Sequence, residues 1–198
     1  MRRSRAALLV ALALAAVAPA AAAVAAGATP AAFDEVLALL AARRHGHVDF
    51  TEVQQLAMLE RPLESSGELL YDAPDRLEKR TLKPKPETLL LQHGELSARR
   101  GRHTYHLEVS AYPQVAPLVE SIRATLAGDR ATLERLFHVQ FQGALEHWTL
   151  NLAPLDAALA RVITDIRIVG ERDAVRSVEV RQQDGDRSLL SLGPELAP

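Results

Sequence analysis

Apolar and polar residues alternate along two long stretches of the chain, and this period of two is typical of strands with one dry face and one wet face. Residues 103–109 show it most clearly, because Tyr105, Leu107 and Val109 share one face and polar residues occupy the other. The other predicted strands cover residues 47–59, 67–72, 77–82, 87–92 and 95–98 before a helical region, and 139–142, 148–152, 165–169, 177–180 and 188–192 after it.

Two regions instead repeat their apolar residues at helical spacing. Phe33, Val36, Leu37 and Leu40 predict an early helix, with Gly46 as its expected stop. Between the two sets of strands, a second helix is predicted from the apolar stripe of Val115, Leu118, Val119, Ile122 and Leu126.

Turn and cap residues separate these elements. Asp129 can cap a short third helix that reaches Phe137. Asp184-Gly185 is the strongest hairpin signal, because both residues tolerate positive φ. Residues 83–86 contain two prolines and cannot continue a central strand.

The element order is one helix, about five strands, a helical region and about five more strands. Two-faced antiparallel strands in this number form a sheet that twists and curls, and its concave apolar face needs a cover. The helices at 33–40 and 115–126 are the available covers. The sequence therefore predicts an α+β fold, an incomplete (half-open) antiparallel β-barrel of about ten to eleven strands with a helical lid.

The first 26 residues have the layout of a secretory signal peptide. Arg2, Arg3 and Arg5 precede an apolar run over residues 6–18, and residues 20–28 offer several A-x-A cleavage sites. The run is rich in alanine and falls short of the roughly 20 strongly apolar residues of a membrane span, so a cleaved signal is favoured over an anchor. We therefore expect residues 27–198 to form a single mature domain in the periplasm.

Composition narrows the function classes. The chain has no cysteine, which excludes disulfides, thiol nucleophiles, thiolate metal sites and a lipidated N-terminal cysteine. Without the three arginines of the signal, 20 basic and 25 acidic residues remain, a net charge of −5. A mildly acidic protein is a poor candidate for nucleic acid, whose binding depends on phosphate neutralisation.

A set of individually weak motifs follows in a fixed order along the chain. Residues 66–77 (SGELLYDAPDRL) contain a G-x-L strand, a proline and the start of a charged strand. Pro84 or Pro86, the apolar strand at 89–91 and the turn at 93–94 come next. The second half adds residues 147–154 (HWTLNLAP), 165–180 and 184–188. In this order the motifs resemble the periplasmic outer-membrane lipoprotein carrier family, the LolA-like proteins.

One position departs from the family pattern. Ala73 stands directly before the first proline, where typical carriers have an arginine that is associated with holding the lid. The resemblance therefore implies a divergent member with a different lid latch, of a kind that could carry another acylated molecule.

The resemblance also implies a soluble, non-catalytic shuttle that needs no cofactor. Such carriers take a lipid-modified protein from an inner-membrane ATP-driven complex and pass it to an outer-membrane acceptor, here expected to act as a monomer. Each buried methylene is worth about 0.8 kcal/mol, so an exposed acyl chain is costly in water. A lid that competes with the ligand for the same apolar face lowers the apparent affinity and permits release.

We expect the apolar face of the sheet to form the acyl-chain cavity and the central helix to form its lid, although an ordinary dry core is the alternative for each residue. The predicted cavity residues are Leu69, Tyr71, Leu89, Leu91, Tyr105, Leu107, Trp148, Leu150, Leu152, Ile166, Ile168, Val178 and Val180. The predicted lid residues are Leu118, Val119, Ile122 and Leu126.

Other candidate sites are weaker. His45 with His47, and His103 with His106, lack partners at the spacing of a metal site. Residues 99–103 (RRGRH) could dock an acidic partner, but such a run is more often a solvated hairpin tip. No nucleophile elbow, phosphate loop or dinucleotide fingerprint occurs, so no catalytic residue, metal site or cofactor is predicted.

Two other functions stay open at the level of sequence. A non-catalytic assembly or docking factor of the cell envelope could use the same fold with a solidly filled core. A periplasmic hydrolase would need polar residues that converge inside the cavity, which sequence alone does not reveal.

Overall fold

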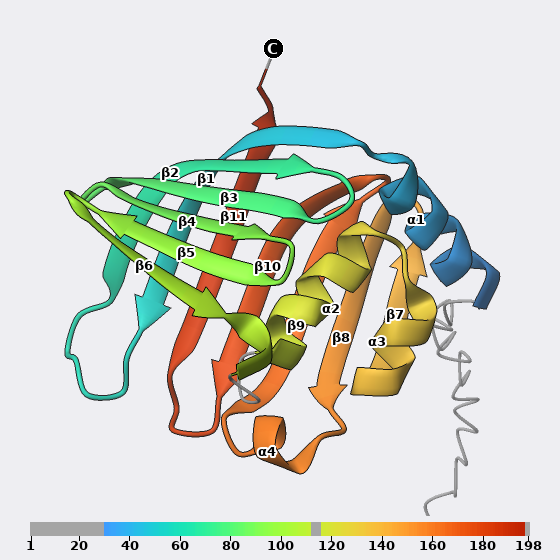
Figure 1. Cartoon of the computed structure of the whole chain (residues 1–198). Coiled ribbons are helices and arrows are strands. Elements are labelled where there is room, and N and C mark those ends of the chain that lie inside the picture. The colour runs from blue at the N-terminus through green and yellow to red at the C-terminus, as the bar shows by residue number, and fades with distance from the viewer. Residues whose placement is uncertain (1–29, 112–115, 197–198) are drawn as a thin grey trace, which may run out of the picture.

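One antiparallel sheet forms the body of the protein (Figure 1). The computed structural model describes residues 30–111 and 116–196. Within them the strands are β1 His45–Gln55, β2 Leu63–Asp72, β3 Arg76–Lys83, β4 Glu87–Gln92, β5 Glu95–Arg100, β6 His103–Glu108, β7 Phe137–Ala144, β8 His147–Pro154, β9 Ile163–Glu171, β10 Ala174–Gln182 and β11 Arg187–Glu195. Their order across the sheet is β6-β5-β4-β3-β2-β1-β11-β10-β9-β8-β7.

The sheet is open, because β6 and β7 stand at its two ends and do not pair with each other. Strands that follow each other along the chain pair as hairpins on either side of the helical region, while β1 pairs with both β2 and β11. The sheet bends so that β2–β6 curl over the face that carries the helices (Figure 1). This is the α+β half-barrel that the sequence predicts.

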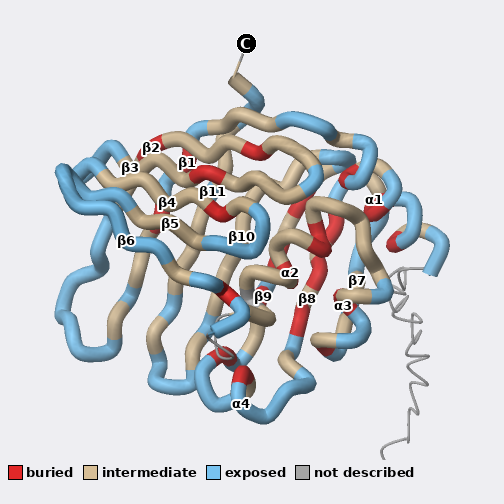
Figure 2. Tube along the Cα trace, in the orientation of Figure 1, coloured by how far each residue is buried: buried red, intermediate tan, exposed pale blue. Residues whose placement is uncertain are grey.

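Helices cover the part of the concave face formed by β7–β9 (Figure 1). They are α1 Pro30–Ala42, α2 Ala116–Leu126, α3 Arg130–Leu136 and α4 Ala157–Ala160, with a 3-10 turn η1 at Val109–Ala111. The core lies between these helices and the sheet (Figure 2). It consists of Phe33, Val36, Leu37, Leu40, Ala124, Leu133, Phe137, Trp148, Leu150, Leu152, Leu159, Ile163, Ile166 and Ile168.

Two residues fix the junction of α2 and α3. The Asp129 carboxylate accepts a hydrogen bond from the backbone N–H of Thr132 at 3.0 Å and caps α3, as predicted. Gly128 has a φ of +65°, and a Cβ there would lie 2.4 Å from the carbonyl oxygen of Leu37. Glycine therefore ends α2 and lets α1 approach this corner closely.

Several boundaries differ from the sequence prediction, and strand pairing explains three of them. α1 ends at Ala42, and Gly46, the predicted stop, lies inside β1. β2 begins at Leu63 rather than at residue 67, because β1 pairs with it along its whole length. Phe137 begins β7 instead of ending α3. Pairing with the neighbouring strand of a hairpin decides each of these ends, and the apolar pattern within one segment does not contain that information.

The predicted signal peptide, residues 1–26, lies outside the described residues, as does Val115 of the predicted lid stripe. Over residues 30–111 and 116–196, no helix has the length and apolar character needed to cross a bilayer.

Candidate functional site

Side chains on the concave face form apolar rows across the sheet, because residues paired between antiparallel strands point to the same side. The rows lie on both sides of the seam between β1 and β11, where Phe50 pairs with Leu192 and joins the two halves of the chain. Two of them are Leu96–Leu91–Leu77–Tyr71, from β5 to β2, and Leu190–Val178–Ile168–Leu150–Phe141, from β11 to β7.

The helices do not fill all the space above this face. A cavity of about 390 Å³ lies between the sheet and α2, within the range of about 300–1,000 Å³ typical of small-ligand pockets. Most of its wall is aliphatic: Leu69, Leu77, Leu89, Leu91, Leu96, Val119, Ile122, Leu126, Ile168, Val175, Val178, Val180, Leu190 and Leu192. The polar residues in the wall are Glu52, Lys79, Thr125 and Ser188.

α2 presents different faces to its surroundings. Val119, Ile122 and Leu126 line the cavity, whereas Ser121 and Ala124 are fully buried in a helix that packs against α1 and α3. The Thr125 hydroxyl donates to the carbonyl oxygen of Ser121 at 2.7 Å, so its polar group is satisfied within the helix. The sheet side of α2 is therefore apolar and partly unpacked.

The structure brings nine of the predicted cavity and lid residues together around this cavity. They are Leu69, Leu89, Leu91, Ile168, Val178 and Val180 from the sheet, and Val119, Ile122 and Leu126 from α2. Tyr71 lines an adjoining cavity of about 290 Å³, which also contains Leu69 and Leu126. Leu118 belongs to α2, but its side chain lies outside the described part.

A second group of predicted cavity residues is packed core instead. Trp148, Leu150, Leu152 and Ile166 are at most 2% exposed and belong to the core cluster. They lie on β8 and β9, where α1, α3 and α4 gather beside β7–β9 and leave no space. Alternation identifies the buried face of a strand, but it does not show whether a helix fills the space above it.

Tyr105 and Leu107 form a third group that lies away from the cavity. Their partners Ala98 and Leu96 place them on the cavity face, but β6 is an edge strand and largely exposed (Figure 2). Tyr105 is 64% exposed. The helices do not extend over this end of the sheet, so these side chains lack a cover.

The sequence prediction misses five aliphatic wall residues, namely Leu77, Leu96, Val175, Leu190 and Leu192. Leu77 comes from a strand that alternates imperfectly and is highly charged, residues 77–82, and Val175 precedes a register shift in β10. Strand register is the signal that would have found them: Leu77 pairs with Leu91, and Leu190 pairs with Val178.

The wall of the cavity carries a charged pair. The Lys79 ammonium lies 2.5 Å from a carboxylate oxygen of Glu52 and 4.9 Å from the centre of the Phe50 ring. The hydroxyl of Ser65 donates to Glu52 at 3.2 Å, and that of Ser188 donates at 2.9 Å. These residues come from β1, β2, β3 and β11, so no local sequence motif could predict the cluster.

The cluster keeps Glu52 ionised. Burial alone would raise the pKa of Glu52, but the hydrogen bond and charge of Lys79, with hydrogen bonds from Ser188 and Gln54, bring this pKa below the ordinary 4.5. The carboxylate is therefore negative at neutral pH, and the Lys79 ammonium balances it.

A larger and more polar hollow of about 800 Å³ adjoins the cavity and shares Leu91 and Val119 with it. Its charged lining residues are Asp75, Glu95, Glu108, Glu120, Arg123 and Arg135. The aliphatic cavity therefore borders a polar space beside the turn between β4 and β5, which suits a ligand with an apolar tail and a polar remainder.

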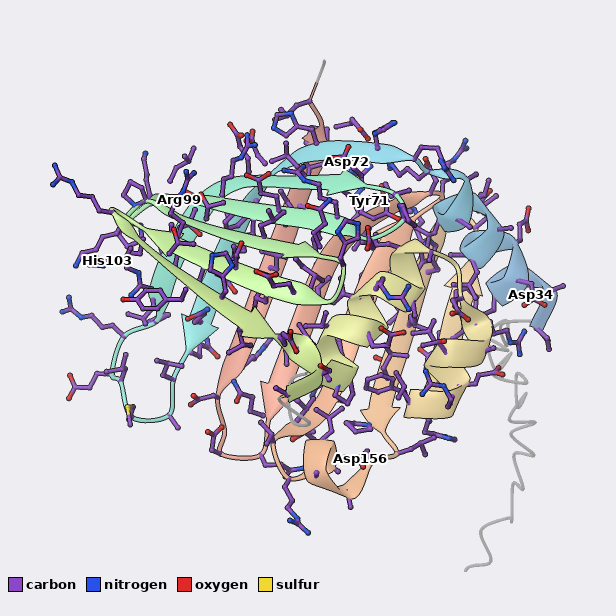
Figure 3. All side chains as sticks on the ribbon, in the orientation of Figure 1. Asp34, Tyr71, Asp72, Arg99, His103 and Asp156 are labelled. Atoms are coloured by element: carbon purple, nitrogen blue, oxygen red, sulfur yellow. The ribbon has the colours of Figure 1, made fainter. Side chains whose placement is uncertain are left out.

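The weaker candidate sites have ordinary partners. His45 lies 2.9 Å from an oxygen of Asp72, and His106 contacts Glu95. Over the residues that the structure describes, no cluster of three or more metal-binding side chains is found. Arg99 and His103 lie at the outer end of the β5–β6 hairpin (Figure 3).

Comparison with protein families gives a match that covers most of the chain. The family model described as "Outer membrane lipoprotein carrier protein LolA-like" matches residues 17–194. No curated protein matches the sequence.

Solved structures match the chain at low identity. A LolA superfamily protein from Nitrosomonas europaea has a TM-score of 0.42 and 12% identity, over 82% of this chain and 92% of that chain. A DUF1329 family protein from Desulfovibrio piger has a TM-score of 0.47 and 8% identity, over 83% and 91%. A chain in the MucA/MucB complex of Pseudomonas aeruginosa has a TM-score of 0.45 and 14% identity, over 83% and 58%.

Proposed function

The chain belongs to the outer membrane lipoprotein carrier protein LolA-like family, and from this premise we propose that it shields the acyl chains of a lipoprotein or another lipidated cargo during transfer between membranes. The family match spans both halves of the sheet and the helices between them. The absence of catalysis and the need for no cofactor are part of the proposal.

The aliphatic cavity beneath α2 is the observation that supports this function most directly. Its wall combines side chains from eight strands and one helix. Unfilled apolar space costs a protein stability, since the residues around it lose packing partners. A hydrocarbon chain that fills this space would restore those contacts.

The energetics suit transport. Burial of a methylene is worth about 0.8 kcal/mol, so a chain of roughly 16 carbons gains on the order of 10 kcal/mol when fully buried. Part of that gain is lost to ordering the chain. The remainder is enough to remove an acyl group from water without making its capture irreversible.

α2 is the proposed movable lid. Its ion pair, between Arg123 and Glu120, lies within the helix, and no ion pair in the described part of the chain ties α2 to the sheet. Ala73, where typical carriers have arginine, offers no side-chain latch. Packing against α1 and α3 holds α2 over the cavity, while Val119 and Ile122 face the cavity, where an acyl chain would meet them.

The proposal includes a location and partners. Residues 1–26 would direct export and be cleaved, which leaves residues 27–198 as a monomeric periplasmic domain. The cargo would come from an inner-membrane release complex and go to an outer-membrane acceptor. The alternative is a non-catalytic assembly or docking factor of the cell envelope with the same fold.

Two neighbouring leucines on β4 provide a matched test. Leu89 lines the cavity, whereas Leu90 pairs with Glu78 and Ser97 and so points to the other face of the sheet. Binding of a fluorescent fatty acid would be measured for Leu89→Gln and for Leu90→Gln. We expect Leu89→Gln to weaken binding about tenfold or more, because an amide in an apolar wall costs roughly 1–3 kcal/mol, and Leu90→Gln to bind like the wild type.

Protein purified from the periplasm should also carry an acyl ligand that native mass spectrometry detects. Uniformly empty protein that takes up no fluorescent fatty acid would overturn the carrier role and favour the docking factor. Equal loss of binding in both variants would show that the cavity is not the binding site.

A further inference from the structure

A charged pair stands in the wall of a mostly aliphatic cavity. The side chains of Glu52 and Lys79 are 11% and 22% exposed, and both line the cavity. Removing two charges from water is expensive, and a well-packed apolar pair would often be equally stable or better. Stability alone is therefore a poor reason for this pair.

The hydrogen-bonding capacity of the cluster is unevenly used. Glu52 accepts from Lys79, Ser65 and Ser188, so both of its oxygens are occupied. A lysine ammonium has three N–H donors, and its acceptor within the described residues is Glu52. The Phe50 ring faces the ammonium on another side at 4.9 Å. The cluster thus has an ammonium donor to spare, while both oxygens of its carboxylate already accept hydrogen bonds.

The aliphatic wall begins next to this donor. Lys79 pairs directly with Leu69 on β2 and with Leu89 on β4, and Glu52 pairs with Leu190 on β11. All three leucines line the cavity. An acyl chain whose head group lies at Lys79 would enter the apolar rows at once.

We propose that the Glu52–Lys79 cluster is a head-group site, in which the Lys79 ammonium donates a hydrogen bond to an oxygen acceptor at the end of an acyl chain. The proposal rests on the proposed function, because the chain itself would occupy the cavity. The recognised chemistry is a carboxyl oxygen, carried either by a free fatty acid or by an acyl ester. An alkyl ammonium should bind more weakly, because Lys79 repels it and both oxygens of Glu52 already accept hydrogen bonds.

Three ligands of equal chain length test this chemistry: hexadecanoic acid, its methyl ester and hexadecylamine. Their affinities would be measured by displacement of a neutral fluorescent lipid probe. In the wild type, we expect the best oxygen acceptor to bind about tenfold more tightly than the amine, since hydrogen bonds to a charged group are worth more than neutral ones. A higher affinity for the acid than for the ester would identify free fatty acids as the source. Equal affinities for the acid and the ester, both above that for the amine, would identify acyl esters.

The variant Glu52→Gln/Lys79→Met removes both charges and keeps the volume of the wall. We expect the preference over the amine to shrink to about twofold or less. The matched control is Glu78→Gln/Arg80→Met, which removes an ion pair from the same strand on the opposite face. This control should keep the wild-type preference.

The outcomes separate the two proposals. If no ligand binds to the wild type, the carrier function fails. If all three bind equally well, or if the Glu52→Gln/Lys79→Met variant keeps the wild-type preference, the head-group site is overturned while the cavity stands.

Discussion

Lys79 keeps the Glu52 carboxylate charged inside an apolar wall. The contribution of this pair to the stability of the fold therefore depends on pH. The folded protein holds the pKa of Glu52 below 4.5. A carboxyl group with a lowered pKa stabilises the fold above its unfolded pKa, and this stabilisation is lost as the pH falls through the folded pKa. The Glu52–Lys79 pair therefore stabilises the fold at neutral pH, and this stabilisation is lost in acid.

The variant Lys79→Met should reverse this pH dependence. Burial then dominates and raises the pKa of Glu52 above 4.5, so the carboxylate destabilises the fold at neutral pH and protonation relieves it. We expect a loss of about 2 kcal/mol at pH 7, below the roughly 3–5 kcal/mol of a fully buried pair, and a smaller loss at pH 4. Urea unfolding at pH 7 and pH 4 measures the free energy of unfolding of the variant and the wild type.

The double variant Glu52→Gln/Lys79→Met is the control for that experiment. It leaves no uncompensated charge and should recover most of the stability at pH 7. A loss in Lys79→Met that is the same at both pH values would contradict the assigned role of the pair.

Gly170 and Trp148 form a tight contact that a second variant can probe. A Cβ at Gly170 would lie 2.1 Å from a ring carbon of Trp148, whose indole N–H donates to the carbonyl oxygen of Arg172 at 3.0 Å. Gly170→Ala should displace the ring and cost about 1–3 kcal/mol. Because Trp148 is the only tryptophan, its emission should shift to the red; an unchanged spectrum and unfolding midpoint would contradict this packing.

At the scale of elements, α2 decides whether an apolar strand position is core or cavity wall. Leu150 and Leu89 occupy the same face of one sheet. Leu150 is 1% exposed in the core, whereas Leu89 faces the space beneath α2. The difference comes from how closely the helices approach each part of the sheet.

A disulfide between α2 and the sheet should test the movement of the lid. Leu91 and Val119 line both the cavity and its polar neighbour, and the chain has no cysteine of its own. In Leu91→Cys/Val119→Cys, oxidation should slow or block uptake of a fluorescent fatty acid, and a reductant should restore it. The two single-cysteine variants serve as controls. Uptake that oxidation does not change, despite a formed disulfide, would show that the ligand enters without movement of α2.

Sequence prediction succeeds where a feature depends on neighbours in the chain and fails where it depends on how the helices approach the sheet. Local signals predicted the α3 cap at Asp129 and the bounds of β4 at residues 87–92, because these depend on neighbours in the chain. The placement of Trp148 in the core and of Tyr105 at an exposed edge depends on which helix lies above each strand. The Glu52–Lys79 pair depends on the register of distant strands. The spacing of apolar residues within one segment shows neither where a helix will lie nor which residues of distant strands will pair.

At the scale of the whole molecule, the cavity belongs to both halves of the chain. Its wall contains Leu69 and Leu89 from the first half and Val178 and Leu190 from the second. A ligand in this position bridges the halves and should stabilise the folded state of the entire protein, since it binds the folded form alone.

Thermal unfolding measures this coupling. A saturating fatty acid, at about 100 times its dissociation constant, should add roughly 2.7 kcal/mol and raise the melting temperature of the wild type in one cooperative transition. Leu89→Gln should show a much smaller rise under the same conditions. Two separate transitions, with only one moved by ligand, would contradict a cavity shared by both halves.

The pairing of β1 with β11 also determines when the cavity can form during synthesis of the chain. During synthesis the first strand emerges long before its partner, since residues 48–55 pair with residues 187–195. Until the last strand arrives, β1 keeps one open edge and the wall lacks Leu190 and Leu192. A nascent chain therefore has no complete cavity until β11 has been made, and the proposed uptake of lipid must wait for that strand.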